Sequence, residues 1–339
     1  MMKTKIVYCL VSDQEDYYYE QLLISLCSLR KHNPEALVEV VCDNNTYATL
    51  HKNRSSIFNY NIYVNPVDVP EDWGKQEQSR YLKTNLRKLT RGNYLYVDTD
   101  TIICSSLDFV DDFTFEIAAV KDSHVERVLP KPFRCKYDSE YWIWERAQLA
   151  NVNITGLLHY NSGVMYVKDT QVADELYTRW FNIYSALLKK GVKADQLSLL
   201  LSNFEMNNVI SSLPDDLNCQ VITALSRDTL HNAKIVHYFP FHERTLLSSH
   251  WILDPIKESG KISSSVLHIL DDPYSFFTDE PKVVKGDVAS LLNTPNLFPA
   301  YKYSHKAFNI FMTVLSSYVR LKKNMHMILH SIKHMLRSW

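Results

Sequence analysis

Two aspartates one residue apart, Asp98 and Asp100, follow the short apolar and aromatic run YLYV at positions 94–97. The aromatic and β-branched residues of this run, with the apolar pair Ile102 and Ile103 beyond it, predict a buried strand. Side chains two positions apart along a strand point the same way, so the two carboxylates would lie side by side. Like charges in a buried setting are costly unless a cation lies between them. The pair therefore favours a divalent metal carried with a phosphorylated ligand, and the simpler alternative is an aspartate-rich turn after the strand.

The segments before the pair predict an α/β domain. Residues 5–11 have a strand pattern that ends at Ser12, residues 19–29 have apolar residues at helical spacing, and residues 37–42 form a second strand pattern. A third strand is expected near residues 62–64 and a helix at about residues 78–89. Strand, helix and strand with polar residues at the strand ends are typical of nucleotide-binding domains. We therefore expect the aspartate pair at the carboxyl end of a central strand, where open α/β sheets bind ligands.

Further apolar patterns predict the remaining strands and helices: strands at residues 115–120, 164–167 and 235–238, and helices at residues 172–188 and from about residue 194. The segment from residue 121 to about residue 158 has no regular pattern and is expected to be irregular. It is rich in aromatic residues, and Trp142 and Trp144 suit either a sugar-stacking surface or a small packed lid.

Composition excludes several classes of protein. The chain of 339 residues has a formal net charge of −1, and we expect no nucleic acid partner. It has only 7 glycines and no GxGxxG or GxxxxGK motif, so neither a dinucleotide fingerprint nor a P-loop is present. Charged residues occur too early for a signal peptide, and no apolar run is long enough to span a bilayer. Six cysteines without metal-ligand spacing predict reduced thiols, and together these features predict a cytoplasmic protein.

Six segments in this order resemble the glycosyltransferases of family 8, which are nucleotide-diphosphosugar transferases: KIVYCLVSD, RYLKTNLRKL, YLYVDTDTII, HYNSGVMYVK, ADQLSLL and IVHYF. The resemblance covers roughly residues 3–240. It implies the GT-A fold, an α/β architecture with a Rossmann-like mixed central sheet flanked by helices. We expect a catalytic domain at residues 1–270 and a C-terminal helical, basic segment at residues 271–339.

The resemblance also implies a metal site. In such enzymes the two aspartates of the DxD motif and a histidine on a later strand hold Mn²⁺ or Mg²⁺ against the diphosphate of the donor. The matching residues here are Asp98, Asp100 and His237. Without the resemblance, His237 would be interpreted as a core histidine. Further positions are expected to bind the UDP-sugar donor, namely Leu10, Val11, Ser12 and Thr99.

Four more residues match family positions near the donor. Lys83 matches a basic position, and Asn161 matches an asparagine that contacts the donor sugar. Asp195 and Gln196 match a pair carried by a helix, in which the aspartate binds sugar hydroxyls and the glutamine lies near the anomeric carbon. The structural alternatives are a surface lysine at residue 83, a turn at residue 161 and a helix N-cap at residue 195.

The implied activity is metal-dependent transfer of a hexose from a UDP-sugar, commonly UDP-glucose or UDP-galactose, to a cell-surface glycan or a lipid-linked acceptor. Family 8 enzymes generally retain the anomeric configuration. The chain departs from the family after IVHYF, where FPFHER replaces the usual glycine and Lys-Pro-Trp. Either His242 or Arg244 would have to take over that contact with the diphosphate.

Two other functions fit the aspartate pair. In a phosphatase of the haloacid dehalogenase type, Asp98 would be a phosphorylated nucleophile and Asp100 the acid/base, with Asp215 and Asp216 as a later acidic pair. The phosphatase motif normally follows the first strand of its domain, whereas several strands and helices are expected before Asp98 here, which argues against this alternative. A non-catalytic protein that binds sugar nucleotides is the second alternative, since the Lys-Pro-Trp is missing.

The C-terminal segment predicts a membrane contact. No acidic residue follows Asp287, and residues 301–339 combine apolar residues at helical spacing with basic ones, including Arg320, Lys323 and Arg337. An amphipathic basic helix suits an anionic lipid surface, so we expect the protein on the inner face of a membrane. A break near Lys322 is an option. The alternatives are packing on the catalytic domain and a homodimer through heptad-spaced apolar residues.

Overall fold

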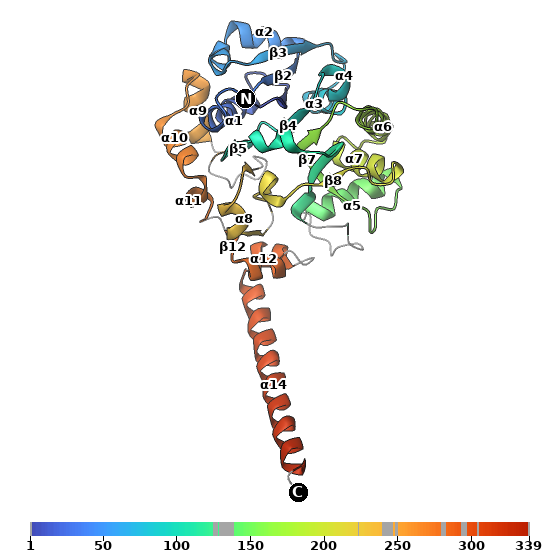
Figure 1. The fold of residues 1–339 in the computed structure, drawn as a ribbon, viewed down its shortest axis with the longest axis vertical. Coiled ribbons are helices and arrows are strands. Elements are labelled where there is room, and N and C mark those ends of the chain that lie inside the picture. Colours follow the sequence, from blue (N-terminus) through green and yellow to red (C-terminus); the bar gives the residue numbers. More distant parts are fainter. Residues whose placement is uncertain are drawn as a thin grey trace.

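A computed structural model describes residues 2–124, 128, 139–222, 224–238, 247, 250–278, 283–292, 297–303 and 305–337. Its centre is a seven-stranded mixed sheet with helices on both faces, in the strand order β3-β2-β1-β4-β7-β6-β8 (Figure 1). The predicted fold class, a mixed central sheet flanked by helices, is confirmed. The strands are β1 (Lys5–Leu10), β2 (Val38–Asp43), β3 (Tyr63–Val67), β4 (Tyr94–Val97), β6 (Ile117–Lys121), β7 (Tyr160–Val167) and β8 (Ser211–Ser212).

Strand direction changes at the middle of this sheet. Strands β3, β2, β1 and β4 are parallel, whereas β7 runs antiparallel to both β4 and β6. Alternate residues of β1 enter opposite cores, with Ile6 and Tyr8 in one and Val7 and Cys9 in the other. This alternation follows from the period of two in a strand, and it explains why the predicted strand is apolar throughout, since both of its faces are buried.

A small second sheet receives the chain after the aspartate pair. It consists of β5 (Thr101–Ile103), β11 (Ile235–His237) and β9 (Cys219–Gln220), in the order β5-β11-β9. The chain leaves the large sheet at the end of β4 and enters the small one at Thr101, so residues 98–100 form the crossing. A further parallel pair joins β10 (Leu225–Ser226) and β12 (Val283–Val284).

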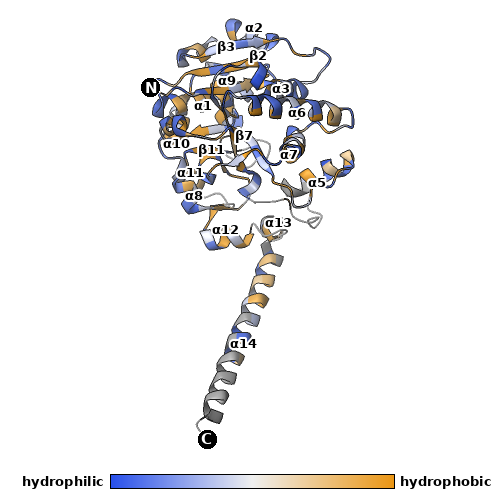
Figure 2. Cartoon of the chain, turned by 45° about the vertical axis from the view of Figure 1, so that its right-hand side comes forward, coloured by the Kyte–Doolittle hydropathy of each residue, from blue (hydrophilic) through white to orange (hydrophobic). Residues whose placement is uncertain are grey.

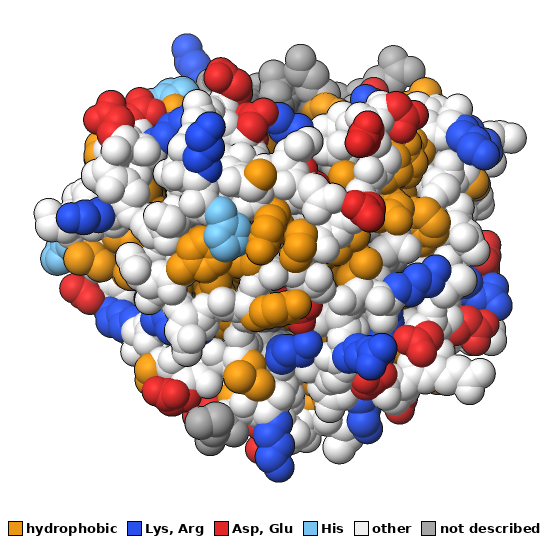
Figure 3. Space-filling model, turned by 90° about the horizontal axis from the view of Figure 1, so that it is seen from above, with side chains coloured by type: hydrophobic (Ala, Val, Ile, Leu, Met, Phe, Trp, Pro, Cys, Tyr) orange, Lys and Arg blue, Asp and Glu red, His pale blue; other side chains and the backbone are white. Residues whose placement is uncertain are grey.

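The helices of the body that contains the two sheets lie between these strands in the sequence. They are α1 (Tyr18–His32), α2 (Asn44–Lys52), α3 (Lys75–Thr84), α4 (Leu86–Leu89), α5 (Ser139–Ala150), α6 (Gln171–Leu188), α7 (Asp195–Glu205) and α8 (Arg227–His231). Short 3₁₀ segments are η1 (Ser55–Tyr60), η2 (Asp108–Asp112), η3 (Asp122–His124) and η4 (Asp215–Asn218). Positive and negative side chains are interspersed on the face opposite the C-terminal helix (Figure 3).

Three sequence expectations need correction. The helix predicted at residues 78–89 is two helices, α3 and α4, separated at Asn85. Strand β7 begins at Tyr160, four residues before the predicted strand. The segment expected to be irregular contains α5, because Ile143 and Ala147 bury one helical face against the N-terminal half of α7.

The chain after residue 249 first returns to the main core. It forms α9 (His250–Ser259), α10 (Ser264–Asp271) and α11 (Pro273–Thr278), followed by α12 (Gly286–Leu292), α13 (Leu297–Tyr303) and α14 (His305–Arg337). Phe277 and Val283 still belong to the main core. The division expected at residue 270 stays a prediction.

Helix α14 projects away from the body as one continuous helix of 33 residues (Figure 1), about 50 Å long at ~1.5 Å per residue. Its root is anchored, since Phe308 packs with Leu292 and Phe298. The break suggested at Lys322 does not occur. Apolar side chains beyond the root are exposed and include Ile310, Phe311, Val314, Leu315, Tyr318, Leu321 and Met325. Figure 2 shows hydrophobic residues along the part of this helix nearest the body. Within the described parts of the chain, none of the helices has the length and apolar character needed to cross a bilayer.

Candidate active site

The site forms where β4, β7 and β11 meet. In the small sheet, His237 of β11 lies opposite Thr101 of β5, and the Tyr238 amide donates to the Asp100 carbonyl at 3.1 Å. On the other side, the Asp98 amide donates to the Gly163 carbonyl of β7 at 2.7 Å. Backbone pairing between sheets therefore brings residues about 140 positions apart in the sequence into one place.

Asp98, Asp100 and His237 each direct one ligand atom to a common point. These atoms lie within 4.8 Å of one another, and His237 Nε2 is 3.1 Å from Asp100 Oδ1 and 3.9 Å from Asp98 Oδ2. The other ring nitrogen, Nδ1, lies 3.1 Å from Asn218 Oδ1. An Nδ1–H donated to Asn218 leaves the Nε2 lone pair facing the carboxylates, as in metal-binding histidines. Two carboxylates with one imidazole are a donor set that fits Mn²⁺ or Mg²⁺.

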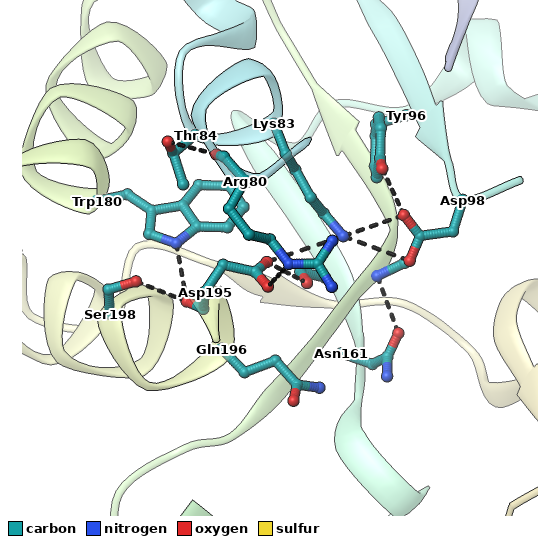
Figure 4. Close-up of polar contacts among 12 residues, drawn as sticks. Arg80, Lys83, Thr84, Tyr96, Asp98, Asn161, Trp180, Asp195, Gln196 and Ser198 are labelled. Carbon is teal, nitrogen blue, oxygen red and sulfur yellow. Dashed lines mark hydrogen bonds and ion pairs between the residues drawn. The ribbon is translucent and has the colours of Figure 1, made fainter. Parts of the chain in front are cut away.

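Lys83 of α3 lies beside this cluster and is buried. Its Nζ is 3.1 and 3.3 Å from the two carboxylate oxygens of Asp98 and 4.8 Å from the centroid of the Tyr96 ring. The Tyr96 hydroxyl also donates to Asp98 (Figure 4). The alternative of a surface lysine is therefore wrong, because the inward face of α3 carries Lys83 to the carboxyl end of β4.

Asp98 is held as a carboxylate. Burial by itself would raise the pKa of Asp98, but the nearby Lys83, His237 and Arg80 lower it below its ordinary value. The same environment acts on Asp195, whose pKa burial would raise and whose neighbours Arg80 and Lys83 lower to about 2. Both side chains therefore carry a full negative charge at neutral pH.

Asp195 is the first residue of α7 and faces the site. Its carboxylate accepts from Ser162 Oγ at 2.9 Å and lies 2.8 Å from Arg80 Nε and 3.8 Å from Lys83 Nζ (Figure 4). The N-cap of α7 is Ala194, and no side chain caps the helix there. The helix-cap alternative for Asp195 is therefore wrong, since its side chain binds residues of α3 and β7.

Asn161 and Gln196 share one partner, Asp122. Asn161 Nδ2 donates to Asp122 Oδ1 at 2.9 Å, and Gln196 Nε2 donates to the same oxygen at 3.1 Å. Asn161 lies within β7, so the turn alternative for this residue is wrong. The structure thus brings both predicted amide residues to one buried carboxylate.

The other residues predicted to bind the UDP-sugar donor lie at or just beyond strand ends. Leu10 and Val11 are buried in the apolar cores, so only their backbone is available to a ligand. Ser12 Oγ accepts from Arg54 and donates to Asp16. Thr99 is half-buried in the crossing between β4 and β5. Binding of a donor by these four residues stays a prediction.

Sequence reasoning missed three residues of the site. Arg80 precedes Lys83 by three positions on α3, a spacing that puts both on one helix face. Asp122 directly follows β6, so the rule that found Asp98, a polar residue at a strand end, applied to it as well. Gly163 had no comparable signal, because its role is to leave space for the ring of the distant His237: a Cβ atom at residue 163 would lie 2.3 Å from His237 Cε1.

Charge within the site is unbalanced. Among the described residues, the four aspartates at positions 98, 100, 122 and 195 lie near three cations, Arg80, Lys83 and Arg146, the last of which interacts electrostatically with Asp122 and Asp195. This leaves an excess of one negative charge. A bound divalent ion would offset that excess.

The acidic pair of the phosphatase alternative has other partners. Asp216 lies 3.1 Å from Lys234 Nζ, and Asp215 lies 3.3 Å from His124 Nδ1. His242 and Arg244, the suggested replacements for the missing lysine, lie outside the described residues. Of the two tryptophans of α5, Trp142 is exposed, whereas Trp144 is half-buried and packs on the core beneath α5.

Comparison with known proteins gives matches among solved structures alone. No protein-family model matches the chain, and no curated protein matches it in sequence. The galactosyltransferase LgtC, solved with donor and acceptor sugar analogs, is similar at 15% identity and a TM-score of 0.48, over 78% of this chain and 99% of that one. Mouse xyloside xylosyltransferase 1 is similar at 12% identity and a TM-score of 0.45, over 69% and 97% of the two chains. The glycosyltransferase GlyE of Streptococcus pneumoniae TIGR4 is similar at 15% identity and 0.45, over 80% and 64%.

Proposed function

We propose that this protein is a metal-dependent glycosyltransferase that moves a hexose from a UDP-sugar, UDP-glucose or UDP-galactose, to a glycan or lipid-linked saccharide with retention of configuration. The observation that carries the proposal is the cluster of Asp98, Asp100 and His237 at the junction of two sheets. The ligand set alone would suit several enzymes, but the adjoining Asp195 and Gln196 at the start of α7 add groups that suit a sugar.

In this proposal Asp98, Asp100 and His237 hold Mn²⁺ or Mg²⁺. The ion, when bound, supplies Lewis-acid stabilisation of the charge that develops on the UDP leaving group. The chain itself contributes Lys83 and Arg80, whose positive charges stand beside the carboxylates and suit an anionic donor.

Asp195 and Gln196 act on the transferred sugar. The ionised Asp195 is held by Arg80 and Ser162 and accepts hydrogen bonds from sugar hydroxyls. Gln196 lies next in the chain, with an uncharged amide that supports developing positive charge at the anomeric carbon without contacting the diphosphate. Asn161, buried beside them, orients the donor.

The acceptor belongs to a membrane surface in this proposal. The exposed apolar side chains of α14 lie on the same helix as the exposed Lys306, Arg320 and Lys322, and no acidic residue follows Asp287. Anionic lipid complements this charge, whereas a homodimer would place two identical basic helices together. We therefore propose a cytoplasmic enzyme on the inner face of the membrane, with Trp142 as a stacking surface for the acceptor sugar.

The decisive experiment is a screen of UDP-sugars for hydrolysis with purified full-length protein in Mn²⁺. We expect turnover of one hexose donor and its loss with EDTA. Hydrolysis of a generic phosphomonoester without UDP-sugar turnover would support the phosphatase alternative. UDP binding without any turnover would support a non-catalytic protein, and either result would refute the proposal.

A further inference from the structure

We propose that Asp122 is a positioning residue that turns the side-chain amide of Gln196, so that the carbonyl oxygen Oε1 and not Nε2 is left for the transferred sugar. This inference rests on the proposed function. It concerns a residue outside the metal cluster, located in the turn that follows β6.

The chemistry of a carboxylate decides how the two amides point. An ionised carboxylate only accepts hydrogen bonds, whereas a side-chain amide has one end that donates and one end that accepts. Because Asp122 Oδ1 lies 2.9 Å from Asn161 and 3.1 Å from Gln196, both amides must present their NH₂ groups to it. Their carbonyl oxygens then face away from Asp122.

The two carbonyl oxygens have different surroundings. Asn161 Oδ1 accepts from the Gly163 amide at 2.9 Å and from Asn218 Nδ2 at 3.0 Å, so it is fully used inside the protein. Among the described residues, none donates a hydrogen bond to Gln196 Oε1. Gln196 therefore has one end held by the protein and one end available to a ligand.

The backbone that carries Asp122 is strained and firmly held. Ser123 and His124 both have positive φ angles, 52° and 56°, which non-glycine residues adopt at a cost in free energy. Gln220 holds this turn, because its side-chain Oε1 accepts from the Ser123 backbone N–H at 2.8 Å and its backbone N–H donates to His124 Nε2 at 3.3 Å. The Asp122 amide also donates to the His159 carbonyl at 2.9 Å. Backbone strain at two successive residues is typical of functional sites. We therefore expect the direction of the Asp122 side chain to matter.

The charge of Asp122 also polarises the amide of Gln196. Around its second oxygen, Ser123 Oγ donates at 3.2 Å and His159 Nδ1 lies 3.7 Å away. Burial lowers the pKa of His159 more than Asp122 raises it, so the ring is neutral at neutral pH and does not cancel the charge. An N–H donated to a carboxylate pushes electron density towards the carbonyl oxygen. Oε1 is thereby made a better stabiliser of positive charge at the anomeric carbon.

A double-mutant cycle tests this role in the full-length protein. Asp122→Ala removes the acceptor, and Asp122→Asn keeps one acceptor oxygen without the charge. We expect kcat for UDP-sugar turnover to fall on the order of a hundredfold and tenfold, respectively. The KM for the UDP-sugar and the Kd for UDP in Mn²⁺ should change by less than about twofold, because Asp122 does not bind the diphosphate. In a Gln196→Ala background, neither change at Asp122 should lower kcat further.

The control is Asp111→Asn, since Asp111 likewise accepts from two N–H groups, those of Lys3 and Thr4, but lies outside the site. It should leave kcat unchanged. Thermal unfolding shows whether Asp122→Ala is folded. If it is not, the double-mutant cycle is measured with Asp122→Asn alone. If the changes at Asp122 lowered kcat equally in the wild-type and Gln196→Ala backgrounds, the role of Asp122 would be overturned while the proposed function stayed intact. A wild-type protein that turns over no UDP-sugar would overturn both.

Discussion

Gly163 of β7 lies directly against the imidazole of His237. A Cβ atom at residue 163 would be 2.3 Å from His237 Cε1 and 2.8 Å from His237 Nδ1, distances far shorter than van der Waals contact. The backbone of β7 therefore leaves just enough room for the histidine ring, and a side chain of any size at this position would displace it from Asp100.

Gly163→Ala should consequently damage the metal site. The alanine methyl group would push the ring away from the carboxylates, so we expect the Mn²⁺-dependent affinity for UDP to fall by about tenfold or more, with destabilisation of about 1–3 kcal/mol from overpacking. Isothermal titration with UDP and Mn²⁺, together with urea unfolding, measures both. Gly74→Ala is the matched control, because its Cβ would meet the far end of the flexible Glu77 side chain. Equal affinity in wild type and Gly163→Ala would show that the ring position does not matter for binding.

Asp98→Asn and Asp100→Asn should each abolish sugar transfer and weaken UDP binding in Mn²⁺. Each change removes one negative charge from the proposed metal site, which corresponds to a loss of several kcal/mol of transition-state stabilisation. His237→Ala should have the same effect in a milder form, since it removes a ligand atom without removing a negative charge. Circular dichroism checks that the fold is intact. Near-normal transfer by either aspartate variant, or activity that resists EDTA, would mean that the metal site is wrongly assigned.

Acid should destabilise the protein partly through Asp195. Its pKa is about 2 in the folded protein against an ordinary value of 3.8, so the unfolded chain takes up the proton at a higher pH than the folded one. The stabilisation from this group is complete above about pH 4 and is lost as the pH falls towards 2, with a magnitude of about 2 kcal/mol. Urea unfolding between pH 5 and pH 2 should show a shallower loss of stability in Asp195→Asn than in wild type. Parallel curves for the two proteins would contradict the low pKa of Asp195 in the folded protein.

Helix α14 should bind anionic vesicles through its exposed apolar residues. Val314 and Leu321 are 63% and 61% exposed, so replacing both by Asp should remove apolar contact and add negative charge without disturbing the body. We expect the double variant to lose sedimentation with phosphatidylserine vesicles at low salt and to keep its UDP-sugar turnover. Asn324→Asp, a charge change at an exposed polar residue of the same helix, should reduce binding by a much smaller factor. Equal vesicle binding by wild type and the double variant would refute the membrane contact.

Local sequence patterns were sufficient for the order and type of most elements and for the aspartate pair, whereas His237 was singled out only by the resemblance. Strand β4 could be predicted because YLYV is apolar on both faces, and Asp98 and Asp100 stand out as charged residues at its end. Lys83, Asp195 and Gln196 could be singled out as residues, because motifs in a fixed order carry them, although the sequence alone left a surface or capping role open for the lysine and the aspartate. The apolar and basic pattern of the C-terminal segment likewise predicted a helix.

Only the tertiary structure decided which of these residues share a site and in what state. Pairing of β5 with β11 places His237 beside Asp100, a contact between residues 137 positions apart in the chain, which no local pattern encodes. The folded structure buries the Lys83 side chain inside the site. The positive charges of Arg80 and Lys83 together lower the pKa of Asp195. Gly163 and Asp122 belong to the site through contacts with His237, Asn161 and Gln196. Their roles follow from distances across three separate segments, and such distances exist only once the chain has folded.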